Sequence, residues 1–326
     1  VKKKRGRKAK IPVIEDNSVM IKIEKHIEEE KKFTGHYSSW AKKYAPKHID
    51  DMKLPQEIKL KLNYVANNDI PFNMIIKGNC GSGKTTALRC IIRKKQDDDN
   101  VIIFTPADDR GIDAIKMKLL FFVKKETLKH KIVIFEDMDY NITDKTQNEI
   151  SNIMKTHNLD VSYYFTCKDT KVIIDKIQSR CNIFNFRELN ESDTCDVLRN
   201  ICDNCDEDAL KALYFISQGD IRSAITNMEI VSDCYGGEIT ENNVYKICYQ
   251  PNPRQIYNIF YNCLHGELND AINSFGLLKQ KGYCNSDIMQ TIMKMLKVID
   301  IEENIRIEYN KIISNTYIRI TDGNDS

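Results

Sequence analysis

Two consecutive stretches decide the fold: Phe72-Asn73-Met74-Ile75-Ile76-Lys77 and, directly after it, Gly78-Asn79-Cys80-Gly81-Ser82-Gly83-Lys84-Thr85. The first is an apolar run that predicts a buried strand. The second has the pattern G-x-x-x-x-G-K-T, and a helical pattern follows from Thr86. A strand, a glycine-rich loop and a helix in this order form a cradle for phosphates, because the glycines let backbone N–H groups turn toward phosphate oxygens. Lys84 would give a positive charge to the β- and γ-phosphates, and Thr85 could ligate Mg²⁺. The sequence therefore predicts a nucleoside triphosphate site, with Mg²⁺, at residues 78–86.

Similar apolar runs recur through the following hundred residues. They are nearly continuous in Ile, Val and Phe, and helical patterns separate them: 72–77, 101–105, 131–135, 161–166 and 181–186. Such runs are typical of parallel strands that helices cover on both faces. We therefore expect an α/β fold with a five-stranded parallel sheet.

The chain changes character on both sides of this region. Its first 35 residues are basic and then densely charged, with little to bury, which predicts a flexible tail that either binds DNA or serves as a localisation signal. From residue 190 onward only amphipathic helical patterns recur, with breaks at Gly236-Gly237 and Pro251-Asn252-Pro253. We predict four parts: a tail (1–35), a nucleotide-binding domain (36–189), a small helical domain (190–250) and a C-terminal all-α domain (251–326).

The composition is that of an ordinary globular protein and excludes several classes. Of 326 residues, 41% are hydrophobic and 29% are charged, and no apolar run reaches the roughly 18 residues of a membrane span. No apolar stretch follows the basic start, which argues against a secretory signal. The eleven cysteines show no framework spacing, which favours a reducing, intracellular compartment.

Three carboxylates follow the apolar run 131–135, namely Glu136, Asp137 and Asp139. A phosphate-binding loop needs a carboxylate on a neighbouring strand to hold Mg²⁺, and often a second one to polarise the attacking water. This strand end is the best candidate in the chain for both roles.

Six segments, in order and spacing, resemble the small subunits of replication factor C, the AAA+ ATPases that load ring-shaped sliding clamps onto DNA. They are Trp40-Ala41-Lys42-Lys43-Tyr44-Ala45-Pro46; the loop 78–85; Ala107-Asp108-Asp109-Arg110-Gly111-Ile112-Asp113; Glu136-Asp137-Met138-Asp139; Ile177-Gln178-Ser179-Arg180-Cys181; and Gly219-Asp220-Ile221-Arg222. The resemblance implies an AAA+ P-loop domain, a small helical lid and a C-terminal helical collar that joins five subunits in a ring.

The resemblance also implies roles for residues outside the loop. Tyr44 and Pro46 would lie beside the adenine, and Lys168 falls at the sensor-1 position. Arg222 would reach from the lid to the γ-phosphate as the sensor-2 arginine. Arg180 would be the arginine finger that enters the ATP site of the next subunit, where a planar, permanently charged guanidinium suits the spread charge of a transferring phosphoryl group.

Two departures from the family pattern bear on catalysis. The usual Asp-Glu order is exchanged, so Glu136 with Thr85 would hold Mg²⁺ and the shorter Asp137 would orient water. A misplacement by about 1 Å can lower a rate on the order of a hundredfold. Lys168 replaces the usual Asn and cannot accept a hydrogen bond from the water. A second reading therefore stays open, in which the chain binds ATP as a structural ligand and supplies Arg180 in trans.

Contacts to DNA and to the clamp are predicted from the helix that follows Arg110. Arg110, Lys116 and Lys118 could track duplex phosphates, and an ordinary solvated helix face is the alternative. The apolar end of this helix, 119–123, either packs in the core or contributes a clamp contact.

The resemblance implies one function above others: ATP-dependent loading of a sliding clamp at primer-template junctions during DNA replication. Its partners would be other subunits of a hetero-pentameric loader, the clamp and primer-template DNA, with no membrane involved. Richness in Lys, Ile and Asn is compatible with a large DNA virus or a protist, so the site of action would be the nucleus if the source is eukaryotic, or a cytoplasmic replication site if it is viral. Another AAA+ DNA-remodelling or initiator ATPase is the remaining alternative, and it would leave the Asp-Asp-Arg-Gly-Ile-Asp and Ser-Arg-Cys segments without a reason.

Overall fold

The computed structural model describes residues 39–323, apart from the short gaps 96–99, 106–111, 128, 141, 158 and 203. The predicted tail, residues 1–35, lies outside the described residues, as does Arg110. Within the described part, no helix has the length and apolar character to cross a membrane.

Five parallel strands in the described part form one sheet, in the order β2-β3-β4-β1-β5. The strands are β1 (Met74–Lys77), β2 (Val101–Phe104), β3 (Lys131–Phe135), β4 (Val161–Cys167) and β5 (Asn182–Asn185). Each of them coincides with one of the five apolar runs to within two residues, so the predicted five-stranded parallel sheet is confirmed. The loop that follows β1 therefore leaves the sheet between the ends of β4 and β5.

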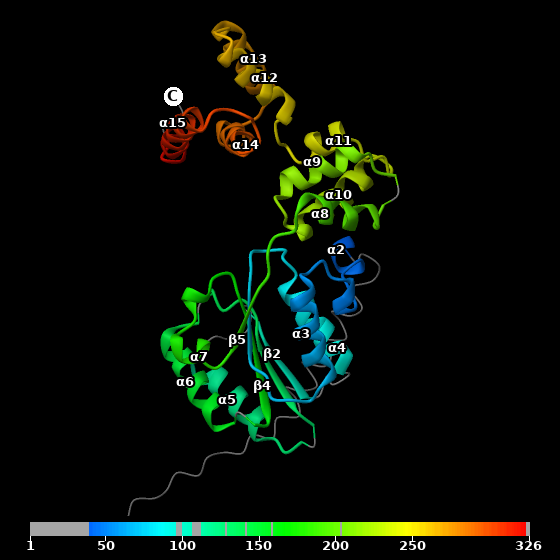
Figure 1. Ribbon diagram of the computed structural model, residues 1–326, viewed down its shortest axis with the longest axis vertical. Helices are drawn as coiled ribbons and strands as arrows, with labels where there is room; N and C mark the ends of the chain where they lie inside the picture. Colours follow the sequence, from blue (N-terminus) through cyan, green and yellow to red (C-terminus); the bar gives the residue numbers. More distant parts are fainter. Residues whose placement is uncertain are drawn as a thin grey trace, which may run out of the picture.

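Helices cover both faces of the sheet (Figure 1). They are α3 (Gln56–Asn67) and α4 (Lys84–Lys95) on one face, and α5 (Ile112–Lys124) and α6 (Asp144–Thr156) on the other. Alternate residues of one strand enter different cores: Met74 and Ile76 pack with α3 and α4, whereas Ile75 packs with α5 and α6. This double burial explains why the strands are apolar throughout instead of alternating with polar residues.

The chain beyond β5 is helical in the described part, as predicted from residue 190 onward. One hydrophobic cluster gathers α8 to α11, and a second gathers α12 to α15 (Figure 1). We call these two groups the lid helices and the collar helices. Their bounds are α8 (Glu191–Arg199), α9 (Glu207–Ser217), α10 (Ile221–Cys234), α11 (Glu241–Ile247), α12 (Pro253–Leu264), α13 (Leu268–Gln280), α14 (Asn285–Leu296) and α15 (Glu303–Thr321).

The first described segment packs on the lid helices. The backbone N–H of Trp40, in α2 (Trp40–Lys43), donates to Oε2 of Glu229 in α10 at 3.0 Å, and the Trp40 ring joins the lid cluster. After the short 3-10 helix η1 (Ile49–Asp51), Lys53 Nζ pairs with Asp196 of α8 at 3.0 Å. The lid is thus fastened to the segment that precedes α3, a contact between the predicted parts 36–189 and 190–250 that the sequence did not suggest.

Candidate nucleotide-binding site

The predicted phosphate-binding loop has the backbone that such a loop requires. The N–H of Gly78 donates to the carbonyl of Cys167 at 3.1 Å, which ties the loop to the end of β4. Gly81 and Gly83 have φ values of 71° and 92°, in the left-handed region that favours glycine. The ammonium of Lys84 donates to the carbonyls of the first two loop residues at 2.7 and 2.9 Å. A cation therefore lies within the curve of the loop, at the place where phosphates are predicted to bind.

The remaining loop residues complete this cradle. Ser82 is buried and its hydroxyl donates to the carbonyl of Asn79 at 2.8 Å, which closes the turn. Cys80 is exposed, and Thr85 and Thr86 are partly exposed in the first turn of α4. Because α4 begins at Lys84, its first backbone N–H groups and the positive end of its dipole face the loop. The residues fit a polyphosphate.

The acidic turn follows β3, two strands from the loop. Asp137 has φ of 47°, and its N–H donates to Oγ1 of Thr166 at 2.8 Å. Asp139 accepts from the backbone N–H groups of Lys168 and the next residue, so it fastens the turn to the end of β4. The roles of Glu136 and Asp137 in holding Mg²⁺ and orienting water stay predictions. Lys168, the predicted sensor-1 residue, is exposed, and its backbone N–H is one of the two that donate to Asp139.

Charges from three elements meet at Glu136. Burial raises the pKa of this carboxyl; the guanidinium of Arg89 opposes that effect, Asp137 adds to it and Arg222 opposes it. The charge of Arg222, the predicted sensor-2 residue of α10, therefore acts on the acidic turn. Arg89 was missed by the sequence analysis, although its place four residues after Thr85, one turn along α4, was an available signal.

Mg²⁺ also fits this donor set. Glu136 is a partly buried carboxylate beside a second carboxylate, Asp137, and carboxylate and hydroxyl oxygens are ligands that Mg²⁺ accepts. Glu136 and Thr85 remain the residues that we predict to hold it.

Pro46 contacts α4, whereas Tyr44 packs against α2. The carbonyl of Pro46 accepts from Sγ of Cys90 at 3.4 Å. The ring of Tyr44 packs edge-on against Trp40, with 6.0 Å between centroids, and is 38% exposed. The structure thus places Pro46 next to the helix that begins at Lys84, and the contact of both residues with adenine stays a prediction.

Arg180 is not brought to the loop of its own chain. It precedes β5 at the amino ends of the strands, whereas the loop follows the carboxyl end of the neighbouring β1. Arg180 is exposed, and its Nη1 donates to the carbonyl of Lys176 at 3.4 Å. Its neighbourhood is nevertheless fixed. Gln147, only 1% exposed, donates to the carbonyl of Val172 at 2.8 Å and accepts from the N–H of Ile174 at 2.9 Å. An exposed cation on a fixed segment is suited to contact another subunit.

The segment between β4 and Arg180 contains η3 (Thr170–Val172) and α7 (Asp175–Gln178). Nε2 of Gln178 donates to the carbonyls of Thr170 and Ile173, at 2.9 and 2.6 Å. Together with Gln147 it holds this segment from both sides.

The predicted DNA residues are only partly available. Nζ of Lys116 pairs with Glu149 at 2.7 Å, whereas Lys118 is exposed. The apolar end of α5 is divided, since Leu119 is fully buried in the core and Phe121 is 80% exposed. Core packing thus accounts for part of this stretch, and contact with DNA or a clamp stays a prediction.

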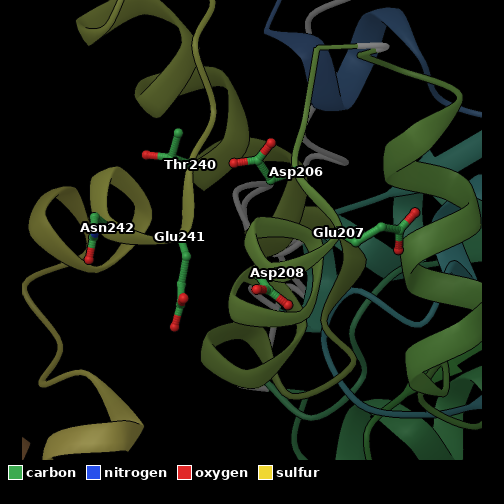
Figure 2. Close-up of a pocket in the computed structure, with 6 residues that line it drawn as sticks. All are labelled: Asp206, Glu207, Asp208, Thr240, Glu241 and Asn242. Carbon is green, nitrogen blue, oxygen red and sulfur yellow. The ribbon is translucent and has the colours of Figure 1, made fainter.

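A separate cleft of about 500 Å³ lies between the first turns of α9 and α11 (Figure 2). Its lining consists of Asp206, Glu207, Asp208, Thr240, Glu241 and Asn242. Arg254 already neutralises one wall, because its Nη2 lies 3.1 Å from Glu241. The cleft contains none of the predicted site residues.

Comparisons with known proteins agree with this architecture. The profile of the family "Replication factor C C-terminal domain" matches residues 251–326. A protein named as a replication factor C small subunit, from Acanthamoeba polyphaga mimivirus, is 32% identical over 293 residues, which cover 87% of this chain and 91% of that protein. Replication factor C subunit 4 of Saccharomyces cerevisiae is 30% identical over 297 residues, covering 87% and 90%.

Among solved structures, a mutant RuvB protein of Thermotoga maritima has a TM-score of 0.52 at 14% identity, over 76% of this chain and 91% of that one, which shows a shared fold. The sheet with its phosphate-binding loop is therefore of the AAA+ type, and the identity to the viral and yeast proteins extends over nearly the whole of each. The chain belongs to the replication factor C small-subunit family.

Proposed function

We propose that this protein is one subunit of a hetero-pentameric clamp loader, and that it uses ATP to place a ring-shaped clamp on DNA at primer-template junctions. The observation that carries the proposal is the phosphate-binding loop itself, in which Lys84 donates to the carbonyls of Gly78 and Asn79 and the start of α10 lies against Gly81. Membership of the replication factor C family supports the role in replication, in the nucleus or at a viral replication site.

The residues of the site have distinct roles in this proposal. Lys84 has three donors, so it can give N–H bonds to the β- and γ-phosphates while it keeps a loop carbonyl. Glu136 and Thr85 hold Mg²⁺, which when bound neutralises phosphate charge. Asp137 accepts a hydrogen bond from the attacking water and aligns it with the γ-phosphate. Arg222 approaches the same phosphate from the lid.

Arg180 serves a different site. On the exposed edge of the sheet it can enter the ATP site of an adjoining subunit, where its guanidinium stabilises the charge of the transferring phosphoryl group. Nucleotide binding would then depend on one subunit and turnover on two.

A second candidate function is favoured by the acidic turn itself. Asp137 is shorter than the glutamate usual in the family, it sits in a left-handed backbone conformation, and a lysine occupies the sensor-1 position. In this version the chain binds ATP as a structural ligand, hydrolyses little, and contributes Arg180 to a neighbour.

The proposal is tested on the native complex purified through this chain. Mass measurement gives partners and stoichiometry, and ATP-dependent transfer of a clamp to primed DNA gives the activity. Lys84→Ala is expected to abolish nucleotide binding at this subunit and to impair loading, whereas Lys61→Ala, which removes an exposed lysine of α3, leaves both unchanged. A complex that contains no clamp-binding activity contradicts the proposal.

The two versions are separated by single-turnover hydrolysis in the assembled complex. A lower rate in Asp137→Ala favours catalysis by this subunit. Equal slow rates in the wild type and the variant favour the structural version.

A further inference from the structure

The start of α10 lies directly against the phosphate-binding loop. A Cβ atom built on Gly81 would meet Oδ1 of Asp220 at 1.9 Å and its Cα at 3.0 Å. Both the backbone and the carboxylate of Asp220 therefore cover the tip of the loop. The lid thus brings two charges toward this site. Besides the cation of Arg222, it places the negative charge of Asp220 against the backbone that is predicted to hold phosphates.

The position of this carboxylate is fixed by the helix that it begins. Oδ1 of Asp220 accepts from the N–H of Ser223 at 3.1 Å, so Asp220 is the N-cap of α10. The preceding Gly219 has φ of 86°, and a Cβ there would lie 2.8 Å from the carbonyl oxygen of Leu189. Residues 219 and 220 therefore pack between the phosphate-binding loop and the segment that follows β5. The carboxylate leaves Gly81 only if it gives up its cap bond to Ser223 or if the first turn of α10 moves.

A second carboxylate borders the same part of the loop. Oε1 of Glu188 accepts from Nδ2 of Asn79 at 2.5 Å. Burial raises the pKa of Glu136, and the charge of Arg222, two residues after Asp220, opposes that rise. The first turn of α10 thus brings a cation that acts on the acidic turn and an anion that lies against Gly81. Lys84 is the cation that lies within the loop.

We propose that Asp220 limits the affinity of the site for nucleotides by opposing the charge of their α- and β-phosphates, and that it thereby speeds the release of a nucleoside diphosphate. This inference rests on the proposed binding of ATP. The loop N–H groups cradle the phosphates that ADP and ATP share, so a carboxylate held at Gly81 disfavours both nucleotides alike. A site without this charge would hold its product longer and turn over more slowly.

The test is Asp220→Asn in the full chain, because asparagine caps a helix as well as aspartate does and removes only the charge. Asp233→Asn, at the exposed far end of α10, is the matched control. Binding and dissociation of fluorescent N-methylanthraniloyl ADP and ATP are followed by stopped flow. We expect Asp220→Asn to bind both nucleotides about three- to tenfold more tightly at low salt, with the gain in slower dissociation. The control should stay within about twofold of the wild type.

Salt separates a charge effect from a structural one. The difference between Asp220→Asn and the wild type should shrink between about 50 mM and about 500 mM salt. Asp220→Ser, which also caps, should behave in the same way, and circular dichroism checks that the helices are kept. The inference about Asp220 is overturned if the nucleotide affinity of both variants is unchanged or weaker, or if the gain in affinity does not depend on salt concentration. Neither result bears on the proposed function. A wild-type chain that binds neither nucleotide overturns the proposed function, and the inference with it.

Discussion

Replacing Arg180 should separate nucleotide binding from turnover. β5 runs parallel to β1, with Asn182 opposite Met74, and the N–H of Phe186 donates to the carbonyl of Lys77, the residue just before the loop. Arg180 precedes Phe186 by six residues, which at about 3.3 Å per residue places it about 20 Å from the loop of its own chain. The Debye length in physiological salt is about 8 Å, so its charge is screened at that distance.

Arg180→Ala should therefore leave the nucleotide affinity of the isolated chain unchanged, to within about 0.5 kcal/mol. In the assembled complex the same change should slow hydrolysis at the adjoining site on the order of 10³- to 10⁵-fold, which corresponds to about 4–7 kcal/mol on the barrier. Arg180→Lys should recover little, because an ammonium cannot replace the bidentate fork. Lys176→Ala, which removes an exposed cation from the same segment, controls for general charge.

Equilibrium binding to the isolated chain and single-turnover hydrolysis by the complex supply the two measurements. A loss of affinity beyond tenfold in the isolated chain would refute the argument from the sheet register. Hydrolysis at the wild-type rate in the complex would refute the role in trans.

Three further changes test the fold and the loop. Gly81→Ala places a methyl group against the carboxylate of Asp220 at a φ of 71°, so it should destabilise the protein by about 1–3 kcal/mol and abolish nucleotide binding. Gly276→Ala, in α13 with open space around it, should instead stabilise the protein by about 0.5–1 kcal/mol. Denaturant unfolding measures both changes in stability. Burial lowers the pKa of His130, whose Nε2 lies 2.7 Å from the Ser162 hydroxyl. Its neutral form is then the one that the fold favours, and the unfolded chain binds more protons. The unfolding free energy of the wild type should therefore fall as the pH drops from about 7.5 to about 5.5. The share of that fall that comes from His130 should be absent in His130→Gln. Thermal unfolding of both proteins at each pH measures the difference. Lys131 is buried and its ammonium donates to two carbonyls at the end of α5, so Lys131→Met should cost about 1–3 kcal/mol in unfolding free energy; a variant as stable as the wild type would contradict that role.

The sequence sufficed for the strands but not for their order. Strands buried on both faces are marked by continuous runs of Ile, Val and Phe, and such a run is a local signal that needs no knowledge of the rest of the chain. Phe104, Phe135 and Phe165 belong to three different runs, yet they stack across adjacent strands, with centroids 4.8 and 5.4 Å apart. Which run pairs with which depends on the crossover helices, and no residue in a run encodes its neighbour.

The same division holds at the site. The phosphate-binding loop was predictable because its glycines, Lys84 and Thr85 are adjacent in the chain. Asp139 looked equivalent to its two neighbours, and only the fold shows that it fastens the turn to β4. The contact between Asp220 and Gly81 joins residues 139 positions apart, so no spacing rule could reveal it.

The exchanged order of the two carboxylates after β3 has a backbone reason. Position 136 continues the strand, since its N–H donates to the carbonyl of Phe104 at 2.9 Å, and it accepts a long side chain without strain. Position 137 is left-handed, with φ of 47°, and aspartate tolerates this conformation better than most residues because its short polar group can bond locally. The carboxylate of Glu136 is then within the electrostatic influence of Arg89 and Arg222. The left-handed position 137 is occupied by aspartate, which tolerates that conformation better than glutamate. The exchange therefore leaves a long carboxylate at position 136, and what it shortens is the side chain at 137 that we propose to align water.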